Sequence, residues 1–308
     1  MDALDDILTT LDLRGALYFR TEFNSPWSVA VPEYEKAARF HLVVTGVCHV
    51  AFPSGYVLRL GAGDLVMIPS GRSHILSDSG ETKAPALETV LKDAGYDGKG
   101  VLILGDGDEN AATQMICGHY SFRHGADHPF LQALPEFLSI TAADRMQRPW
   151  LDDCLRMIAG RVLSGSLGST AAATRLSEAL FIEILDTEFG KDGPLAQVMG
   201  ALRDPQIGTA LTAIHGDPAA PWTVDSLARQ AGMSRSRFSD RFTSLLGLGP
   251  MAYVADWRMQ KALSLLDDER LSIQEVAGRS GYRSAAGFTR AFVSKFGLPP
   301  KQFRQVLA

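Results

Sequence analysis

The chain has 308 residues, which favours two domains at roughly 150 residues each, and its 46% hydrophobic and 21% charged residues exclude a disordered or fibrous protein. The net charge of −5 is unevenly spread: of the 30 basic and 35 acidic side chains, residues 216–308 carry 13 and 8, which leaves 17 and 27 for residues 1–215. A polyanionic partner is therefore expected at the C-terminal end only.

The first residues, Met1–Asp6, lack the basic stretch and the apolar core of an export signal. The longest segment without Asp, Glu, Lys or Arg, Phe40–Leu58, contains glycines, a proline and two histidines, which a membrane-spanning helix disfavours. The cysteines, Cys48, Cys117 and Cys154, are odd in number and widely spaced, so they do not indicate a disulfide framework. We therefore expect a cytoplasmic protein without a membrane partner.

A short helix is predicted at the start of the chain, over Ala3–Leu8, and apolar runs separated by Gly and Pro turns follow from Ala37 onward. Strands are predicted at Phe40–Val44, Cys48–Phe52, Tyr56–Leu60 and Leu65–Ile68. Short strands at this spacing are typical of a sandwich or a small barrel.

The segment Gly63–Asp78 is the most specific feature of this half. It resembles the second motif of the cupin family, and the expected positions are filled by Gly63, Pro69, Gly71 and His74. This resemblance implies a cupin-like β-barrel. The first cupin motif is poor, because Arg39 stands where the family has a metal-binding Glu and the paired upstream histidines are missing, so the usual metal set is incomplete.

Strand alternation suggests a substitute set of ligands, because residues two apart share a face. His41 shares the face of the lost Glu position, His74 comes from the second motif, and Cys117 and His119 share one face of a later strand. Three His and one Cys form a donor set suited to zinc or another divalent metal. The alternatives are a hydrogen-bonded polar core without metal and an organic effector bound without metal.

The segment Asp78–Ala112 is too long for a plain turn and carries a helical stretch near Ala84–Ala94, so it either covers the barrel mouth or is a surface excursion. Two further helices are predicted at Trp150–Leu163 and Ala171–Phe189. The apolar stripe of the second helix either packs on its own barrel or pairs two subunits.

The C-terminal third contains an internal repeat. Leu227–Met233 aligns with Val276–Tyr282 at an offset of 49 residues, and after one extra residue the phenylalanines at 238 and 242 align with those at 288 and 292. Each copy predicts a short helix, a tight glycine turn, and a second helix that begins after Ser234 or Ser284. This is the pattern of a helix-turn-helix motif.

On the second helix of each copy, the phenylalanines define a buried face and mostly small or polar side chains face outward, as a helix in the major groove requires. Arg290 is expected to contact a guanine, whereas Asp240 either accepts from a cytosine amino group or pairs with a neighbouring Arg. The residues expected to contact DNA are Arg235, Ser236, Arg237, Ser239, Asp240, Arg258, Arg283, Ser284, Ala286, Thr289, Arg290 and Lys295.

Between the copies runs an uninterrupted helical pattern, Met251–Leu266, which would hold two reading helices about 34 Å apart on successive major-groove faces. With Gly281–Ser284, Phe288–Phe292 and Phe296–Pro300, the region from Asp204 to Val306 resembles the AraC/XylS family of transcription regulators. The resemblance implies promoter or operator DNA as the partner, a homodimer, and RNA polymerase as a candidate partner.

Three regions are therefore predicted: a cupin-like sensor domain at 1–145, a helical linker and candidate dimerisation element at 146–192, and an all-α DNA-binding domain with two helix-turn-helix motifs at 200–308. The predicted function is transcription regulation controlled by a small molecule or metal in the barrel, without enzymatic activity. The alternatives are a repressor whose barrel only dimerises and, less favoured because the metal set is incomplete, a cupin enzyme with a DNA-binding tail.

Overall fold

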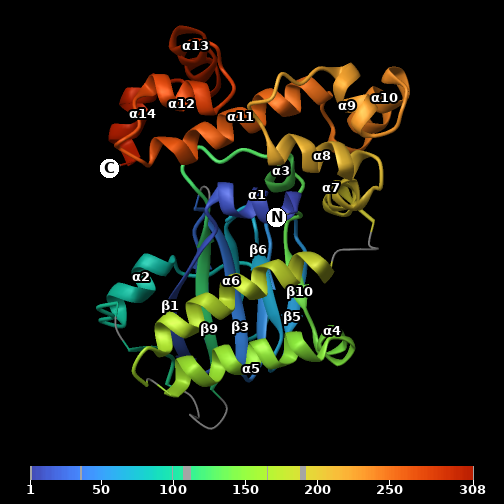
Figure 1. Cartoon of the computed structure of the whole chain (residues 1–308). Helices are drawn as coiled ribbons and strands as arrows, with labels where there is room; N and C mark the ends of the chain where they lie inside the picture. Colours follow the sequence, from blue (N-terminus) through green and yellow to red (C-terminus); the bar gives the residue numbers. More distant parts are fainter. Residues whose placement is uncertain are drawn as a thin grey trace. The chain divides into compact units, whose positions relative to one another are not determined.

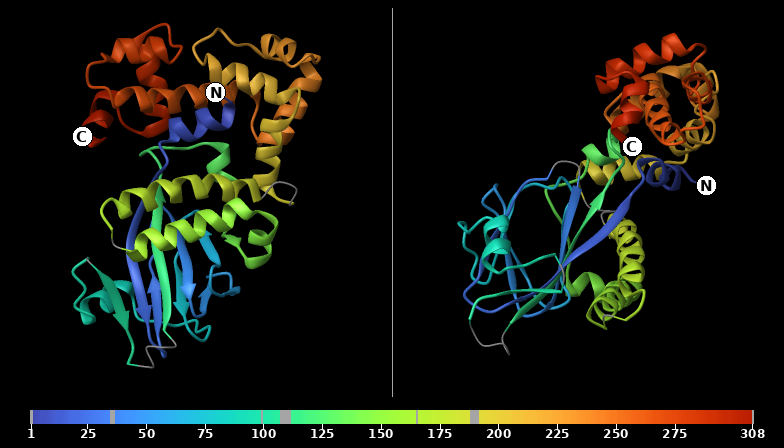
Figure 2. Two further views of the ribbon diagram at one scale, coloured as in Figure 1. Left: turned by 60° about the horizontal axis from the view of Figure 1, so that its bottom comes forward. Right: turned by 90° about the vertical axis from the view of Figure 1, so that its left-hand side faces the viewer.

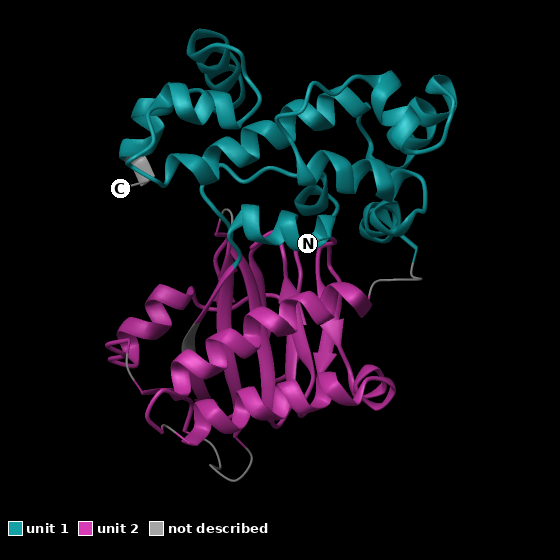
Figure 3. Ribbon diagram, viewed as in Figure 1, with its two compact units in different colours: residues 1–13, 122–134, 189–308 teal, residues 14–121, 135–188 magenta. Residues whose placement is uncertain are grey.

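The computed structural model describes residues 2–34, 37–98, 100–106, 112–164, 166–187 and 192–307 (Figure 1). The chain divides into two compact units (Figure 3). The sheet unit comprises residues 14–121 and 135–188, and the helical unit comprises residues 1–13, 122–134 and 189–308. This division differs from the predicted regions, because two segments of the expected sensor domain belong to the helical unit and the expected linker helices belong to the sheet unit.

The sheet unit is built on two sheets, with the strand orders β10-β6-β3-β9-β1-β8 and β2-β7-β4-β5. The strands are β1 (Arg14–Phe23), β2 (Ser28–Val31), β3 (Ala37–Thr45), β4 (Cys48–Ala51), β5 (Val57–Leu60), β6 (Leu65–Ile68), β7 (His74–Ser77), β8 (Val101–Leu104), β9 (Thr113–Ser121) and β10 (Leu138–Ile140). Among the described residues, paired strands are antiparallel except for β1 and β8, and they form two sheets that are not closed into one barrel, which is consistent with the predicted cupin fold.

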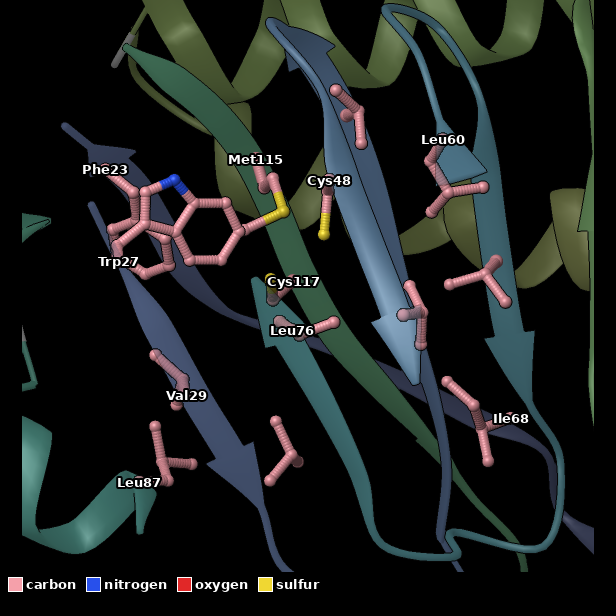
Figure 4. Packing of buried hydrophobic residues seen from close by; sticks show 14 of the residues in the cluster. Phe23, Trp27, Val29, Cys48, Leu60, Ile68, Leu76, Leu87, Met115 and Cys117 are labelled. Atoms are coloured by element: carbon pink, nitrogen blue, oxygen red, sulfur yellow. The ribbon is translucent and has the colours of Figure 1, made fainter. Parts of the chain in front are cut away.

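An apolar core fills the space between the two sheets (Figure 4). Its inward side chains come from both sheets, as strand alternation predicts, and include Phe23, Val29, Leu76 and Met115. The helix α2 (Leu87–Asp93) of the predicted insert buries Leu87 and Val90 in this core, so this part of the insert is no idle surface excursion. Residues 99 and 107–111 of the insert lie outside the described residues.

Helices cover the outer face of the six-stranded sheet (Figure 2). The helices of this unit, besides α2, are α4 (Ala142–Gln147), α5 (Pro149–Ser164) and α6 (Ser169–Thr187). Phe181 of α6 packs on Tyr120 of β9 with the ring centroids 5.0 Å apart, and the Tyr120 hydroxyl donates to the Ser177 carbonyl at 2.8 Å. The apolar stripe of α6 therefore packs on its own sheet. The predicted end of this helix at Phe189 lies outside the described residues.

The cupin motif glycine at position 71 has a steric explanation. Gly71 adopts φ +64°, and a Cβ placed on it would lie 2.2 Å from the Tyr34 carbonyl oxygen. Because no side chain fits there, only glycine allows the turn before β7, which brings His74 to the start of that strand.

The helical unit contains the two predicted helix-turn-helix motifs. Its helices are α1 (Ala3–Leu11), α3 (Pro129–Gln132), α7 (Pro194–Arg203), α8 (Ile207–Gly216), α9 (Val224–Gln230), α10 (Arg235–Leu246), α11 (Pro250–Leu266), α12 (Ile273–Arg279), α13 (Ala285–Phe296) and α14 (Pro300–Leu307). The first motif is α9–α10, the second is α12–α13, and α11 joins them. Capping boxes at Thr223 and Ser272 begin α9 and α12. None of the described helices combines the length and the apolarity needed to cross a membrane.

Candidate DNA-binding surface and effector cavity

The second helix of the first motif, α10, is the first reading helix and has a buried face and an exposed face, as predicted. Phe238 and Phe242 are fully buried, whereas Ser236 and Asp240 are exposed on the opposite side. No ion pair joins Asp240 to another described residue, and both alternatives for its carboxylate stay predictions. The small outward side chains allow the helix backbone to approach base edges.

The second reading helix, α13, has the same construction. Phe288 and Phe292 are fully buried, and Ala286 and Arg290 are exposed. Ser284 caps the helix by accepting from the Gly287 N–H at 3.1 Å. The Ser234 side chain at the matching position of α10 makes no such cap bond.

Four of the twelve predicted DNA-contacting residues make side-chain contacts within the protein: Ser284 with the Gly287 N–H, Arg235 with Asp225, and Arg258 and Lys295 as follows. Arg258 donates to the carbonyls of Pro218 and Ala220, each at 2.7 Å. Lys295 pairs with Asp127 at 2.7 Å and Asp256 at 3.1 Å. Their predicted DNA contacts stay predictions.

The inward placement of Lys295 follows from helix geometry. Seven residues separate it from Phe288, which at about 100° per residue puts both on the inner face of α13. Partial burial acts to lower the pKa of Lys295, but its two carboxylate partners outweigh this and raise it. All twelve predicted residues are exposed or partly exposed.

A narrow cavity lies in the core of the sheet unit and has room for about one water molecule. It is lined by Thr21, Phe23, Val29, Val31, Arg39, His41, Leu76, Leu87, Leu102 and Cys117. Most of these side chains are apolar, and the few polar groups come from β1, β3 and β9. A mostly apolar cavity with a few convergent polar groups is the usual form of a small-molecule site.

The polar end of the cavity is a directed hydrogen-bond chain. His74 Nδ1 lies 2.9 Å from the Arg72 carbonyl and must donate to it, so His74 Nε2 is an acceptor. His41 therefore donates from Nε2 to His74 at 2.8 Å, and its Nδ1 accepts from the Cys117 thiol at 3.0 Å. Both imidazoles are neutral in this arrangement.

The pKa shifts of His41, His74 and Cys117 agree with this hydrogen-bond arrangement. Burial lowers the pKa of His74 to about 4 and lowers that of His41 well below its usual range, where the neighbouring His74 and Arg39 act in the same direction. Burial raises the pKa of Cys117 to about 12. The thiol is therefore uncharged, as a donor to His41 requires.

Strand alternation predicted that His41, His74 and Cys117 lie together, and they do. His119 lies two residues further along β9, opposite Arg39 in the strand register, and is only partly buried. The two nitrogens of His41 contact different partners, Cys117 and His74, and the positive charge of Arg39 disfavours a bound cation at this place. Among the described residues, no group of three or more His, Cys, Asp or Glu side chains has the arrangement of a metal site, so the zinc site stays a prediction.

The fold and these surfaces define a DNA-binding protein with an attached cupin domain. A family model described as "Cupin" matches residues 2–189, and one described as "Helix-turn-helix domain" matches residues 227–306. The chain belongs to the AraC-type transcription regulators with an N-terminal cupin domain.

Similar proteins carry the same description. The chain is 30% identical to the HTH-type transcriptional regulator AlkR of Acinetobacter baylyi over 99% of both chains. It is 24% identical to the RCS-specific HTH-type transcriptional activator RclR of Escherichia coli, over 99% of this chain and 98% of that one. The solved DNA-binding domain of AdpA in complex with a target DNA is 33% identical, covers 33% of this chain and 92% of its own, and has a TM-score of 0.32.

Proposed function

We propose that this regulator reads two adjacent half-sites of promoter DNA with α10 and α13, under the control of a small apolar effector bound in the sheet unit. The exposed outer faces of two equally built reading helices support this proposal most directly. In each helix the phenylalanines anchor one face in the core, and the opposite face is free of large apolar side chains except Val293, which is 37% exposed.

The two reading helices differ in what they offer to bases. Arg290 on α13 can donate two hydrogen bonds to guanine, whereas Asp240 on α10 can accept from a cytosine amino group. Ser236 and Ala286 are short and bring the backbone close to the groove. Exposed Arg235, Arg237 and Arg283 supply phosphate contacts that carry no sequence preference.

The effector proposal rests on the cavity. Its lining is mostly hydrocarbon, with the His41–Cys117 pair and Arg39 at one side, which suits a small apolar molecule bearing a polar group. Because the cavity has room for about one water molecule, such a molecule would displace Leu87 of α2 or its neighbours. Dimerisation, contact with RNA polymerase and the absence of enzymatic activity belong to the same proposal.

Selection of bound duplexes from a random pool, followed by salt titration of the best sequence, tests the DNA part. Arg290→Ala should relax the preference at one base position, at a discrimination cost of about 1–3 kcal/mol. The matched control Arg161→Ala removes an exposed charge of the sheet unit and should leave the preference unchanged. Binding without sequence preference or salt dependence would contradict the proposal.

Thermal shifts with a collection of small apolar compounds test the effector part. A binding compound should raise the melting temperature of the parent protein but not of Leu76→Trp, which fills the cavity. A shift of equal size in both proteins would place the compound elsewhere.

A further inference from the structure

A chain of four buried polar side chains runs through the helical unit, and the proposed DNA contacts do not use it. Asp6 of α1, His215 of α8, Tyr253 of α11 and His128 of the 122–134 segment are 4%, 6%, 1% and 3% exposed. Asp6 Oδ2 lies 3.0 Å from His215 Nδ1, His215 Nε2 lies 2.8 Å from Tyr253 Oη, and Tyr253 Oη lies 3.0 Å from His128 Nε2.

Every hydrogen bond of this chain has one possible direction. The Phe130 N–H donates to His128 Nδ1 at 3.1 Å, so His128 must donate from Nε2 to the Tyr253 oxygen. The Tyr253 hydroxyl then donates to His215 Nε2, and His215 donates from Nδ1 to the Asp6 carboxylate. Both imidazoles are neutral, and burial lowers the pKa of each, that of His128 to about 3.

Asp6, at the acidic end of this hydrogen-bond chain, is also paired with a lysine. Lys261 of α11 donates to Asp6 Oδ1 at 3.0 Å and to the Thr10 hydroxyl at 3.3 Å. Burial acts to raise the pKa of Asp6, but the hydrogen bonds from His215 and Lys261 outweigh it and hold the pKa below its usual value. Tyr253 and Lys261 thus attach α11 at two points, eight residues apart.

The 122–134 segment makes further contacts with the same region. Asp127 binds Lys295 of α13 by its carboxylate and Gln260 of α11 by its backbone N–H. Arg123 pairs with Asp267, which follows α11. Gly125 lies so close to α14 that an added Cβ would be 3.1 Å from the Phe303 ring.

These contacts do not cover the reading faces. The four residues of the hydrogen-bond chain are buried in the interior of the helical unit, whereas Ser236, Asp240, Ala286 and Arg290 stay exposed. The arrangement therefore holds helices in place and leaves the outer faces of α10 and α13 exposed, while it engages Lys295.

The two attached segments are direct continuations of two paired strands. Leu13 precedes the first residue of β1, and Phe122 follows the last residue of β9. The two strands pair along their length, and Thr21, Phe23 and Cys117 from them line the effector cavity. The parts of the chain that line the cavity are thus covalently joined to the parts that hold α11.

We propose that Asp6, His215, Tyr253 and His128, which we call the α11 clamp, are positioning residues that set the spacing of the two reading helices on DNA. The clamp fixes α11, and α11 joins α10 to α12–α13, so its orientation decides whether both motifs reach successive half-sites. This inference rests on the proposed reading of two half-sites.

The test compares two duplexes in fluorescence anisotropy with the full-length protein. One duplex carries both half-sites of the selected sequence, and in the other the second half-site is scrambled. Tyr253→Phe removes the central hydroxyl and should weaken binding to the complete duplex about tenfold, because loss of preorganisation lowers the effective concentration of the second motif. Binding to the scrambled duplex should change less than about twofold.

Tyr120→Phe is the matched control, because it removes an equally buried hydroxyl from the sheet unit. It should leave the ratio of the two affinities unchanged. Duplexes with one base pair added or removed between the half-sites give a second measurement. The parent protein should prefer one spacing sharply, and Tyr253→Phe should accept the neighbouring spacings almost equally.

The outcomes separate the clamp from the function on which it rests. A parent protein that binds both duplexes equally well overturns the reading of two half-sites. A parent with a clear preference, together with a folded Tyr253→Phe that keeps both the ratio and the spacing preference, overturns the clamp. If Tyr253→Phe does not fold, Asp6→Asn takes its place. It alters the last residue of the hydrogen-bond chain, and the affinity for the complete duplex should fall about threefold.

Discussion

Each unit of the protein contains a buried chain of hydrogen-bonded neutral histidines, and the surroundings of the two chains differ. In the sheet unit, Cys117, His41 and His74 end at an apolar cavity. In the helical unit, the α11 clamp ends at the Asp6–Lys261 ion pair and is enclosed by Trp257 and Gln260, which are 1% and 2% exposed.

The packing around each hydrogen-bond chain determines whether its polar groups can exchange partners. A polar chain beside free space can exchange one partner for a water molecule or a ligand, which suits a sensor. A polar chain in close packing has no replacement partner, which suits a structural connection. The loss of stability on removal of one partner should therefore separate the two hydrogen-bond chains.

The largest effect is expected from Tyr253→Phe. It leaves the His128 N–H and the His215 nitrogen without partners in the packed interior, and should lower the free energy of unfolding by about 3 kcal/mol. Urea unfolding of the full chain measures it, with Tyr120→Phe as the control that deprives only one carbonyl of a donor. A loss below about 1 kcal/mol would mean that water replaces the hydroxyl.

Acid should destabilise the helical unit next. His128 has a folded pKa of about 3 against about 6.5 unfolded, so the unfolded chain binds more protons and stability falls as the pH drops from about 6.5 toward 3. At pH 5 this histidine alone should cost about 2 kcal/mol. Hydrogen exchange in α1 and the 122–134 segment at pH 7 and pH 5 should show the opening.

His128→Asn serves as the control for the acid effect. The Asn side chain can still accept from the Phe130 N–H at the start of α3 but does not titrate. This variant should show a shallower loss of stability with falling pH. Equal pH dependence in both proteins would assign the effect to other groups.

A smaller effect is expected from Cys117→Ala in the sheet unit. The cavity beside Cys117 has room for about one water molecule, which can donate to His41 Nδ1 in place of the thiol, so the loss should be about 1 kcal/mol. Urea unfolding compares it with Tyr253→Phe. A loss as large as that of Tyr253→Phe would remove the contrast between the two chains.

The smallest effect on stability is expected from Arg235→Ala. Its pair with Asp225 at 3.2 Å is exposed, so unfolding should change by less than about 0.5 kcal/mol. DNA binding should nevertheless weaken for all sequences, and the slope of its salt dependence should fall by about 1. An unchanged slope would show that Arg235 does not meet a phosphate.

Local signals in the sequence predicted much of the fold. The helix-turn-helix pair was found because phenylalanine spacing, capping residues and turn glycines are all encoded within about 25 residues. Five of the ten strands were predicted from short apolar runs between turns. The strand Arg14–Phe23 was missed, because Arg14, Arg20 and Glu22 interrupt its apolar pattern.

For the candidate sites, the sequence predicted which side chains lie together better than it predicted their bonding partners. Strand alternation placed His41, His74 and Cys117 together, since it depends only on the two-residue period of a strand. It could not predict that His41 bridges its partners with both nitrogens. The inward orientation of Lys295 was available from its spacing to Phe288, but its partner Asp127 lies 168 positions away in the chain.

The class of this protein follows from short-range patterns, because a duplicated helix-turn-helix and a cupin motif are both recognised from residues close together in the chain. The grouping of Ala3–Leu11 and residues 122–134 with the DNA-binding helices is seen only in the folded protein. Their attachment depends on buried polar groups as far apart as Asp6 and Lys261, and each of these groups is stable in the interior only when its distant partner is in place. No periodicity of the chain records such a pairing.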